Sequence, residues 1–270
     1  MTEYFECQDI AKMIDFTLLD PTLTTREFDE GCAFAVQQNL ASVCIPPYYV
    51  ARCAEMLAGT TVRTATAVGY PHGGQRTALK VAEARQALRD GAQELEVTIN
   101  FSKVRSGDWQ YVNDELFALT QTIHGEGAKI KVVSESSWLY DDSKAFLCQI
   151  CGALGVDWVG NSSEALHGEL ALAEVELMRS NSPKNVQIKA AAGMRNLDLL
   201  LAARNIGVSR VGSNRVESIL KESRKRIKRS RVTRIDGWIG NGNSTALPTL
   251  PPLVFEVQRM TGTDMTRPRV

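Results

Sequence analysis

Short β-branched runs alternate with amphipathic stretches along most of this chain, and that alternation limits the fold more than any other feature. Eight runs are typical of strands, at residues 13–19, 41–45, 62–68, 94–99, 129–134, 156–159, 186–190 and 209–211. Strands that alternate with helices form a parallel sheet, and eight such strands can close so that no edge is left exposed. The sequence therefore predicts an α/β fold, a (β/α)8 TIM barrel, over residues 1–222.

Charged residues recur at alternate positions of three predicted strands. Residues two apart share a face, because side chains of a barrel strand point alternately inward and toward the helices. One face of the fourth, fifth and seventh strands is polar, with Glu94, Glu96, Thr98, Lys129, Lys131, Gln187 and Lys189. The other face of the fifth and seventh strands is apolar and suits packing against helices, so we expect the charged face inside the barrel. Unpaired charge there is costly, so Glu96, Lys131 and Lys189 must pair or reach solvent near the carboxyl end.

The charge balance argues against a polyanionic partner. Lys and Arg total 31, as do Asp and Glu, so no net field draws the chain to nucleic acid or an anionic membrane, and a small-molecule partner is expected. The first 15 residues lack an apolar run of signal-peptide length, and no later stretch approaches the roughly 20 apolar residues of a membrane span. We therefore expect a cytoplasmic protein whose six scattered cysteines are reduced thiols.

Cys148 and Cys151 form a CxxC pair that fits two interpretations. The pair lies in an apolar pattern at 145–154, where residues i and i+3 share a helix face, and this favours packing in the interior. The alternative is a redox or metal site, but no second cysteine or histidine pair completes one, and the three histidines are dispersed. We expect packing, and no metal ion.

The carboxyl-terminal segment, residues 223–270, differs in composition from the rest. Eight Lys or Arg residues fall within 221–234, which predicts a basic, solvated end of the last helix, with polyanion binding as the alternative. Residues 237–252 are rich in Gly, Asn and Pro and are typical of a loop. We expect the apolar run at 250–255 to dock on the barrel or on a second subunit. Barrels of this kind often form dimers, so a homodimer is a further expectation.

Six segments at the predicted strands form a series of motifs. They are IDFTLL at 14–19, VCIPP at 43–47, AVGYPHG at 67–73, GAQELEV at 91–97, IKVVSE at 130–135 and KAAAGMR at 189–195. In this order they resemble the strand motifs of the deoxyribose-phosphate aldolase family, the DeoC-like class I aldolases, over roughly residues 10–222. The resemblance implies a TIM barrel that joins acetaldehyde to glyceraldehyde 3-phosphate through a lysine Schiff base, without a metal ion or other cofactor.

The sixth strand departs from that family. The family's reactive lysine lies in a motif like DFVKTSTG, whereas residues 157–164 read DWVGNSSE, which places Gly160 at the lysine. Glycine has no amine and no nearby lysine allows a shifted alignment, so the family mechanism cannot run unchanged. Glu164 replaces a glycine of the family's phosphate cradle and would repel phosphate unless Arg195 or Arg215 neutralised it. We therefore expect weak or absent cleavage of deoxyribose 5-phosphate.

The resemblance also implies the positions of other functional residues. Glu96 stands at the family's catalytic aspartate, and Asp15 and Lys131 are retained. Lys189 matches a cation that assists the Schiff-base lysine. Substrate-binding positions are implied at Cys44 and around the phosphate cradle, at Gly160, Asn161, Ser162, Gly193, Ser213, Asn214 and Arg215.

Two classes of function fit these residues. In the first, an enzyme makes or breaks a carbon–carbon bond beside the carbonyl of a small compound, with Lys189 as the amine. Lys131 would disfavour a second positive charge on Lys189, while Glu96 and Asp15 handle protons and water. A variant drops the imine and lets both lysines stabilise an enolate electrostatically. In the second, a catalytically inactive barrel has a binding or regulatory role, and its interior charges are purely structural. We favour the enzyme, since interior charge is costly without chemistry.

Overall fold

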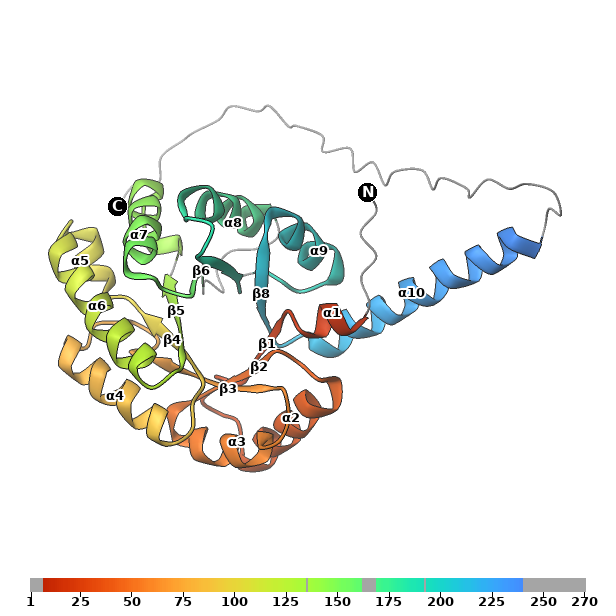
Figure 1. Ribbon diagram of the computed structural model, residues 1–270, viewed down its shortest axis with the longest axis horizontal. Coiled ribbons are helices and arrows are strands. Elements are labelled where there is room, and N and C mark those ends of the chain that lie inside the picture. The colour runs from red at the N-terminus through yellow and green to blue at the C-terminus, as the bar shows by residue number, and fades with distance from the viewer. Residues whose placement is uncertain (1–6, 135, 162–168, 192, 240–270) are drawn as a thin grey trace.

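In the computed structural model, which describes residues 7–134, 136–161, 169–191 and 193–239, eight strands form a closed barrel (Figure 1). Neighbouring strands are parallel throughout, and β1 pairs with β8 to close the ring. The strands are β1 (Ile14–Thr17), β2 (Ser42–Ile45), β3 (Arg63–Val68), β4 (Glu94–Thr98), β5 (Lys129–Ser134), β6 (Trp158–Asn161), β7 (Gln187–Ala190) and β8 (Val208–Ser213). The predicted (β/α)8 fold is confirmed.

Helices alternate with the strands and form a layer outside the barrel (Figure 1). They are α1 (Cys7–Ala11), α2 (Thr25–Gln38), α3 (Val50–Leu57), α4 (Thr77–Arg89), α5 (Phe101–Arg105), α6 (Trp109–Gly125), α7 (Asp141–Leu154), α8 (Glu169–Asn181), α9 (Leu197–Ile206) and α10 (Val216–Ile239), with the 3-10 turns η1 (Pro47–Tyr49) and η2 (Ser136–Trp138). Among the helices described, none is both long enough and apolar enough to cross a membrane.

Helix α10 crosses the boundary expected at residue 222. It continues to Ile239 and extends away from the barrel (Figure 1). The basic segment therefore continues the last helix, as its composition predicted. The apolar run at 250–255 lies outside the described residues, so its docking stays a prediction.

The ends of α2 illustrate how local sequence sets the bounds of these helices. The Thr24 hydroxyl accepts a hydrogen bond from the backbone N–H of Glu27, and the Glu27 carboxylate accepts one from the backbone N–H of Thr24. At the other end Asn39 adopts a left-handed φ of 53°, and its N–H donates to the Val36 carbonyl. The chain reverses there and leads into β2.

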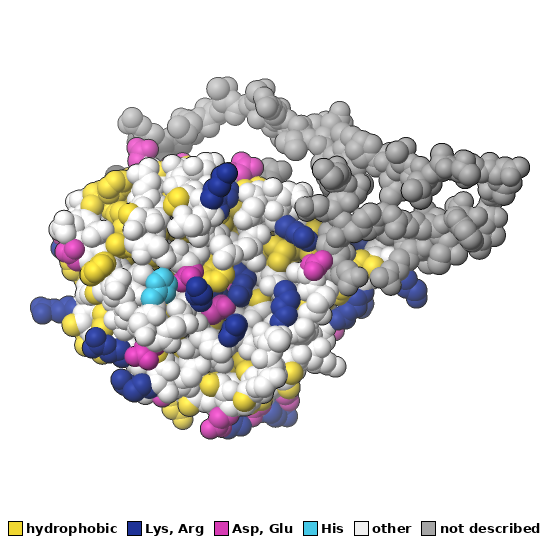
Figure 2. All heavy atoms as spheres, in the orientation of Figure 1, with side chains coloured by type: hydrophobic (Ala, Val, Ile, Leu, Met, Phe, Trp, Pro, Cys, Tyr) yellow, Lys and Arg dark blue, Asp and Glu magenta, His cyan; other side chains and the backbone are white. Residues whose placement is uncertain are grey.

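The two faces of the strands differ as the alternation predicts. Outward residues such as Ile130 are fully buried and pack with the helices in one continuous core. Among inward residues, the strand register sets Glu96 beside Lys131 and Gly160 beside Lys189. The apolar core therefore lies between strands and helices, and the barrel interior is polar. On the face turned to the viewer in Figure 2, basic and acidic side chains gather at the centre, where the strands lie in Figure 1.

Candidate functional site

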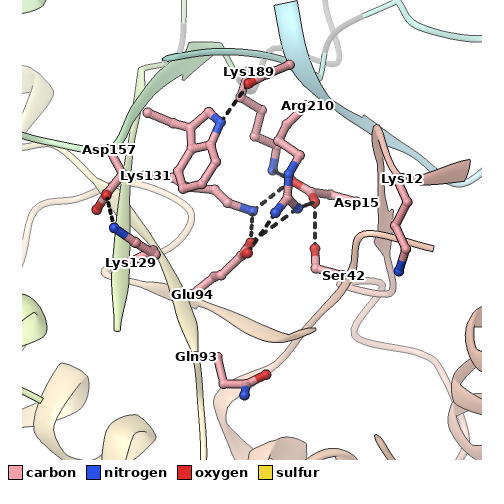
Figure 3. Close-up of polar contacts among 12 residues, drawn as sticks. Lys12, Asp15, Ser42, Gln93, Glu94, Lys129, Lys131, Asp157, Lys189 and Arg210 are labelled. Atoms are coloured by element: carbon pink, nitrogen blue, oxygen red, sulfur yellow. Dashed lines mark hydrogen bonds and ion pairs between the residues drawn. The ribbon is translucent and has the colours of Figure 1, made fainter. Parts of the chain in front are cut away.

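Six charged side chains from five strands meet inside the barrel: Asp15 (β1), Glu94 and Glu96 (β4), Lys131 (β5), Lys189 (β7) and Arg210 (β8). Their side chains are 0–14% exposed. Three carboxylates face three cations, so the cluster has no net charge. In Figure 3 the side chains of Asp15, Glu94, Lys131, Lys189 and Arg210 converge inside the barrel.

Asp15 lies at the centre of this cluster. Its Oδ1 accepts hydrogen bonds from the Ser42 hydroxyl at 2.6 Å and from Arg210 Nη1 at 2.5 Å. Its Oδ2 accepts one from Lys131 Nζ at 2.7 Å. Burial alone would raise the pKa of Asp15, but the charges of Lys131, Lys189 and Arg210 outweigh burial and hold that pKa far below its usual range. Asp15 is therefore a carboxylate at any ordinary pH.

Lys131 is clamped between two carboxylates. Its Nζ lies 2.7 Å from Asp15 Oδ2 and 2.7 Å from Glu94 Oε2. Burial would lower the pKa of Lys131, but Asp15, Glu94 and Glu96 reverse that effect and raise the pKa above its ordinary value. The Trp158 ring, with its centroid 5.7 Å from Nζ, adds a cation–π contact. Lys131 is therefore a permanent ammonium.

Lys189 and Glu96 form a second, adjoining pair. The Lys189 ammonium donates to Glu96 Oε1, and Asp15 Oδ2 lies 3.6 Å from the same nitrogen. Lys131 Nζ also lies 3.6 Å from Glu96 Oε1, which joins the two pairs. Burial would raise the pKa of Glu96, but Lys189 and Lys131 together hold it below its usual range. Glu96 is thus ionised at rest.

The expectation that Glu96, Lys131 and Lys189 would pair is confirmed by these contacts. The expected effect of Lys131 on Lys189 stays a prediction, and the structure adds that Lys131 is itself paired with Asp15 and Glu94. Repulsion between the two lysines is therefore offset by carboxylates that contact both of them.

Two glycines flank the Lys189 side chain. Gly160 pairs with Lys189 across β6 and β7, and a Cβ at position 160 would lie 3.0 Å from Lys189 Cβ and 2.9 Å from its carbonyl oxygen. A Cβ at Gly212 would lie 3.3 Å from Lys189 Cε. In the sequence, Gly160 stands where the family has its reactive lysine. The structure adds that this glycine leaves room for Lys189.

Cys44 lies on β2 and is fully buried beside the cluster. Burial, followed by the charge of Glu96, raises the pKa of the Cys44 thiol well above its ordinary value. The thiol is therefore protonated, and it is a poor nucleophile in this setting.

Other implied substrate-binding residues lie at the ends of the last three strands. Asn161 Oδ1 accepts a hydrogen bond from the Ala191 N–H at 2.9 Å, which ties the end of β6 to the end of β7. The Ser213 hydroxyl donates to the Met194 carbonyl at 3.1 Å and accepts from the Arg215 N–H at 3.0 Å. The ends of β6, β7 and β8 are thus linked by side chains.

The remaining residues of that predicted set are less informative. Asn214 and Arg215 are exposed just before α10, and Gly193 adopts a φ of 73° after β7. Ser162 and Glu164 lie outside the described residues, so their predicted places at a phosphate site stay predictions.

Arg210, Ser42 and Trp158 belong to the cluster but were not identified from the sequence. Glu94 was placed on the inward face without a role. Arg210 follows Ser209 in a predicted strand of only three residues, too short for an alternating pattern to emerge. Its single charge in an apolar strand was the available signal.

In the part of the chain that the structure describes, no three or more His, Cys, Asp or Glu side chains are grouped to hold a metal ion. Cys148 and Cys151 are buried on α7 as free thiols, which agrees with the packing interpretation.

Comparisons with known proteins point to one family. A model described as DeoC/LacD family aldolase matches residues 10–143. A deoxyribose-phosphate aldolase of Rhodopirellula baltica is 47% identical over 223 residues, which cover 83% of this chain and 92% of that protein. A deoxyribose-phosphate aldolase of Thermococcus gammatolerans is 34% identical over 218 residues, covering 80% of this chain and 97% of that protein.

Solved structures agree with the sequence relatives. QR15, an aldolase, has a TM-score of 0.75 at 30% identity, over 81% of this chain and 97% of that one. The deoxyribose phosphate aldolase of Aeropyrum pernix has a TM-score of 0.73 at 23% identity, over 80% and 91%, which shows a likeness of fold alone. With 47% identity to one aldolase across most of both chains, this chain belongs to the deoxyribose-phosphate aldolase family, among the DeoC/LacD family aldolases, and is an aldolase-type lyase.

Proposed function

We propose that this aldolase makes or breaks a carbon–carbon bond beside the carbonyl of a small compound, and that Lys189 is the reacting amine. The observation that carries the proposal is the contact of Lys189 Nζ with the Glu96 carboxylate inside the barrel. Lys131 is less suited, because two carboxylates at 2.7 Å keep it an ammonium. Lys189 has one such close partner, and its second carboxylate is 3.6 Å away.

The pair can exchange a proton. Burial penalises both charged partners, so transfer of the Lys189 proton to Glu96 costs less here than in water. The transfer also removes the charge that chiefly favours ionised Glu96, which strengthens the hold of Glu96 on the proton. The neutral amine then attacks the substrate carbonyl carbon. Glu96 returns its proton to the carbonyl oxygen and the attached nitrogen supplies the second proton. The oxygen then leaves as water, and a protonated imine is formed.

The protonated imine draws electrons from the carbon–carbon bond that begins at the carbon next to the imine carbon. Glu96, which is a carboxylate again once it has returned its proton, lies beside Lys189 and is placed to remove the proton of the neighbouring hydroxyl. The bond then breaks, an aldehyde leaves, and the enamine that remains takes up a proton at carbon. Water hydrolyses the resulting imine and restores the amine. The reverse sequence joins the two fragments.

The names of the relatives make a deoxyribose phosphate the first substrate to test. We expect slow turnover of deoxyribose 5-phosphate, because Gly160 offers no amine and Glu164 adds a carboxylate near the position expected for phosphate. The 47% identity to the Rhodopirellula baltica protein argues for ordinary turnover instead. A rate measured on purified protein decides between them.

A second mechanism and a second class of function share one observation, the pairing of all six interior charges. Lysines held as ammonium ions favour electrostatic stabilisation of an enolate, with Glu96 moving the proton and no imine formed. A fully paired network is also what a non-catalytic barrel with a binding role would retain. Both alternatives predict that no substrate becomes covalently attached.

Borohydride reduction with acetaldehyde tests the proposal. An imine at Lys189 becomes a stable secondary amine, which peptide mapping by mass spectrometry locates. We expect Lys189 to be labelled ahead of other lysines, and Lys189→Met to lose labelling and turnover. Lys129→Met is the matched control, because Lys129 also lies on a barrel strand, β5, but pairs with Asp157 at 2.7 Å, outside the cluster.

The charge-conserving variant Lys189→Arg separates the mechanisms. Arginine keeps the positive charge but forms no imine under these conditions. Loss of turnover in Lys189→Arg supports the amine role. Turnover that survives, without labelling of the wild type, refutes the amine role and favours the electrostatic mechanism. An absence of both labelling and turnover with every carbonyl compound tried favours the binding role.

A further inference from the structure

Arg210 bridges two carboxylates of the interior cluster. Its Nη1 lies 2.5 Å from Asp15 Oδ1, and its Nη2 lies 2.8 Å from Glu94 Oε1. The two nitrogens belong to one rigid planar guanidinium, so the separation and orientation of the two carboxylates are fixed together. The Trp158 ring, with its centroid 5.2 Å from Arg210 Cζ, packs against the guanidinium.

The other oxygens of the same two carboxylates hold Lys131. Asp15 Oδ2 and Glu94 Oε2 each lie 2.7 Å from Lys131 Nζ. Arg210, Asp15, Lys131 and Glu94 therefore form a closed ring of alternating charge (Figure 3). In each carboxylate, one oxygen contacts Arg210 and the other contacts Lys131. Neither carboxylate therefore has a free oxygen to offer a third cation.

Lys189 is that third cation. It lies 3.6 Å from Asp15 Oδ2, the oxygen that Lys131 already holds. Without Arg210, Asp15 would have one fewer cation to neutralise it, and its attraction for the Lys189 ammonium would increase. The ring thus weakens the attraction of Asp15 for the Lys189 ammonium.

The place of Arg210 in the barrel separates it from substrate. Arg210 pairs with Lys189 in the strand register, but its guanidinium reaches Glu94, the first residue of β4, and so extends toward the amino end of the barrel. Substrates of barrel enzymes enter at the carboxyl end. Arg210 is therefore positioned to act through Asp15 and Lys131 rather than by contact with the reacting atoms.

We infer that Arg210 is a positioning residue, which neutralises Asp15 and Glu94 and so limits the attraction of Asp15 for the Lys189 ammonium. This inference rests on the proposed amine role of Lys189. The charged and titratable groups that face Lys189 are Glu96 on β4, Asp15 on β1, Lys131 on β5, Cys44 on β2 and its strand neighbour Arg210 on β8.

Arg210→Met tests the inference through the pH dependence of turnover. The variant changes the cluster from three cations and three carboxylates to two cations and three carboxylates. We expect kcat near neutral pH to fall about tenfold with little change in KM, since Arg210 does not touch substrate. We also expect the acidic limb of the kcat profile to move up by about one pH unit, because the added net negative charge retains the Lys189 proton.

A second substitution makes the readout specific to charge. Arg210→Met combined with Glu94→Gln removes one cation and one carboxylate, so we expect the acidic limb to return toward its wild-type position. Arg210→Lys keeps the positive charge but loses the planar guanidinium that bridges Asp15 and Glu94. We expect this variant to keep the wild-type pH profile with a lower kcat. Lys129→Met is the control and is expected to leave the profile unchanged.

The outcomes separate the two hypotheses. If Lys189 of the wild type is labelled on borohydride reduction but the acidic limb of Arg210→Met stays in place, the inference about Arg210 fails alone. If the wild type is not labelled at Lys189, the proposed amine role fails and the inference fails with it. Should Arg210→Met not fold, the double variant and Arg210→Lys carry the test. An acidic limb shifted in Arg210→Lys by as much as one pH unit would then overturn the inference.

Discussion

Replacing Gly160 by alanine tests whether the barrel needs this glycine for packing. A Cβ at position 160 would lie 2.9 Å from the Lys189 carbonyl oxygen and 3.0 Å from Lys189 Cβ. Non-bonded carbon atoms rest about 3.5–4.0 Å apart, so β6 and β7 would have to separate by about 0.5 Å. The obstacle is backbone on one side and a Cβ on the other, so no change of rotamer relieves it. Overpacking of this kind costs about 1–3 kcal/mol.

We expect Gly160→Ala to lower the free energy of unfolding by about 1–3 kcal/mol, measured by urea titration followed by circular dichroism. Because the strain falls on Lys189 itself, borohydride labelling of Lys189 should fall in the same variant. Gly125→Ala is the matched control. Gly125 ends α6 with no heavy atom within 4 Å of an added Cβ, so that variant should be neutral or slightly stabilising.

Gly160→Lys extends the same test to the position that resembles the family's reactive lysine. The Cβ of the new lysine meets the same atoms, so we expect a loss of stability similar to that of Gly160→Ala, with only partial labelling at position 160. Wild-type stability in Gly160→Ala would show that β6 and β7 adjust freely, and the reasoning from close approach would be wrong. Full labelling at position 160 in a stable Gly160→Lys protein would show the same.

Two further predictions concern a buried ion pair outside the cluster and the effect of acid on stability. Lys80 pairs with Glu115 at 3.0 Å and donates to the Thr98 carbonyl at 2.8 Å, and the side chains of Lys80 and Glu115 are 0–1% exposed. Lys80→Met should therefore lower the free energy of unfolding, measured by urea titration, by about 3–5 kcal/mol, while the folded variant is still labelled at Lys189. The pKa values of Asp15 and Glu96 are lower in the folded than in the unfolded chain, so the free energy of unfolding should fall as pH drops below about 4, with a shallower fall in Asp15→Asn; equal slopes in both proteins would contradict the ion-pair description.

Much of the fold was predictable because its rules are local. In a strand such as β5, apolar and charged residues alternate, and this pattern predicts both the extended conformation and the face that packs against helices. Placing Lys131 and Lys189 inside the barrel required only that alternation, together with the closure of a parallel sheet. Those local rules do not predict which charged residues contact one another. Arg210 contacts residues 116 and 195 positions away in the chain, and one sequence carries no record of such pairs.

The pairing of Lys131 was also hidden from the sequence. Two lysines on nearby inward faces suggest mutual repulsion, which the carboxylates between them offset. The contact between Glu94 and Lys131 is the example. Strand parity places both side chains inside the barrel but does not show that they form an ion pair. The spatial role of Gly160 was hidden in the same way, since a missing side chain shows its purpose only when its neighbours are known.

The interior cluster is better explained by chemistry than by stability. Buried ion pairs are often no more stabilising than well-packed apolar residues of the same volume, so a barrel that needed only stability has little reason to keep six charged side chains in its interior. The cluster is also unevenly arranged. Lys131 and Arg210 are tied into a closed ring with two carboxylates, while Lys189 remains outside it with one close partner. A structural network has no need of that inequality, whereas an amine that must give up its proton requires it.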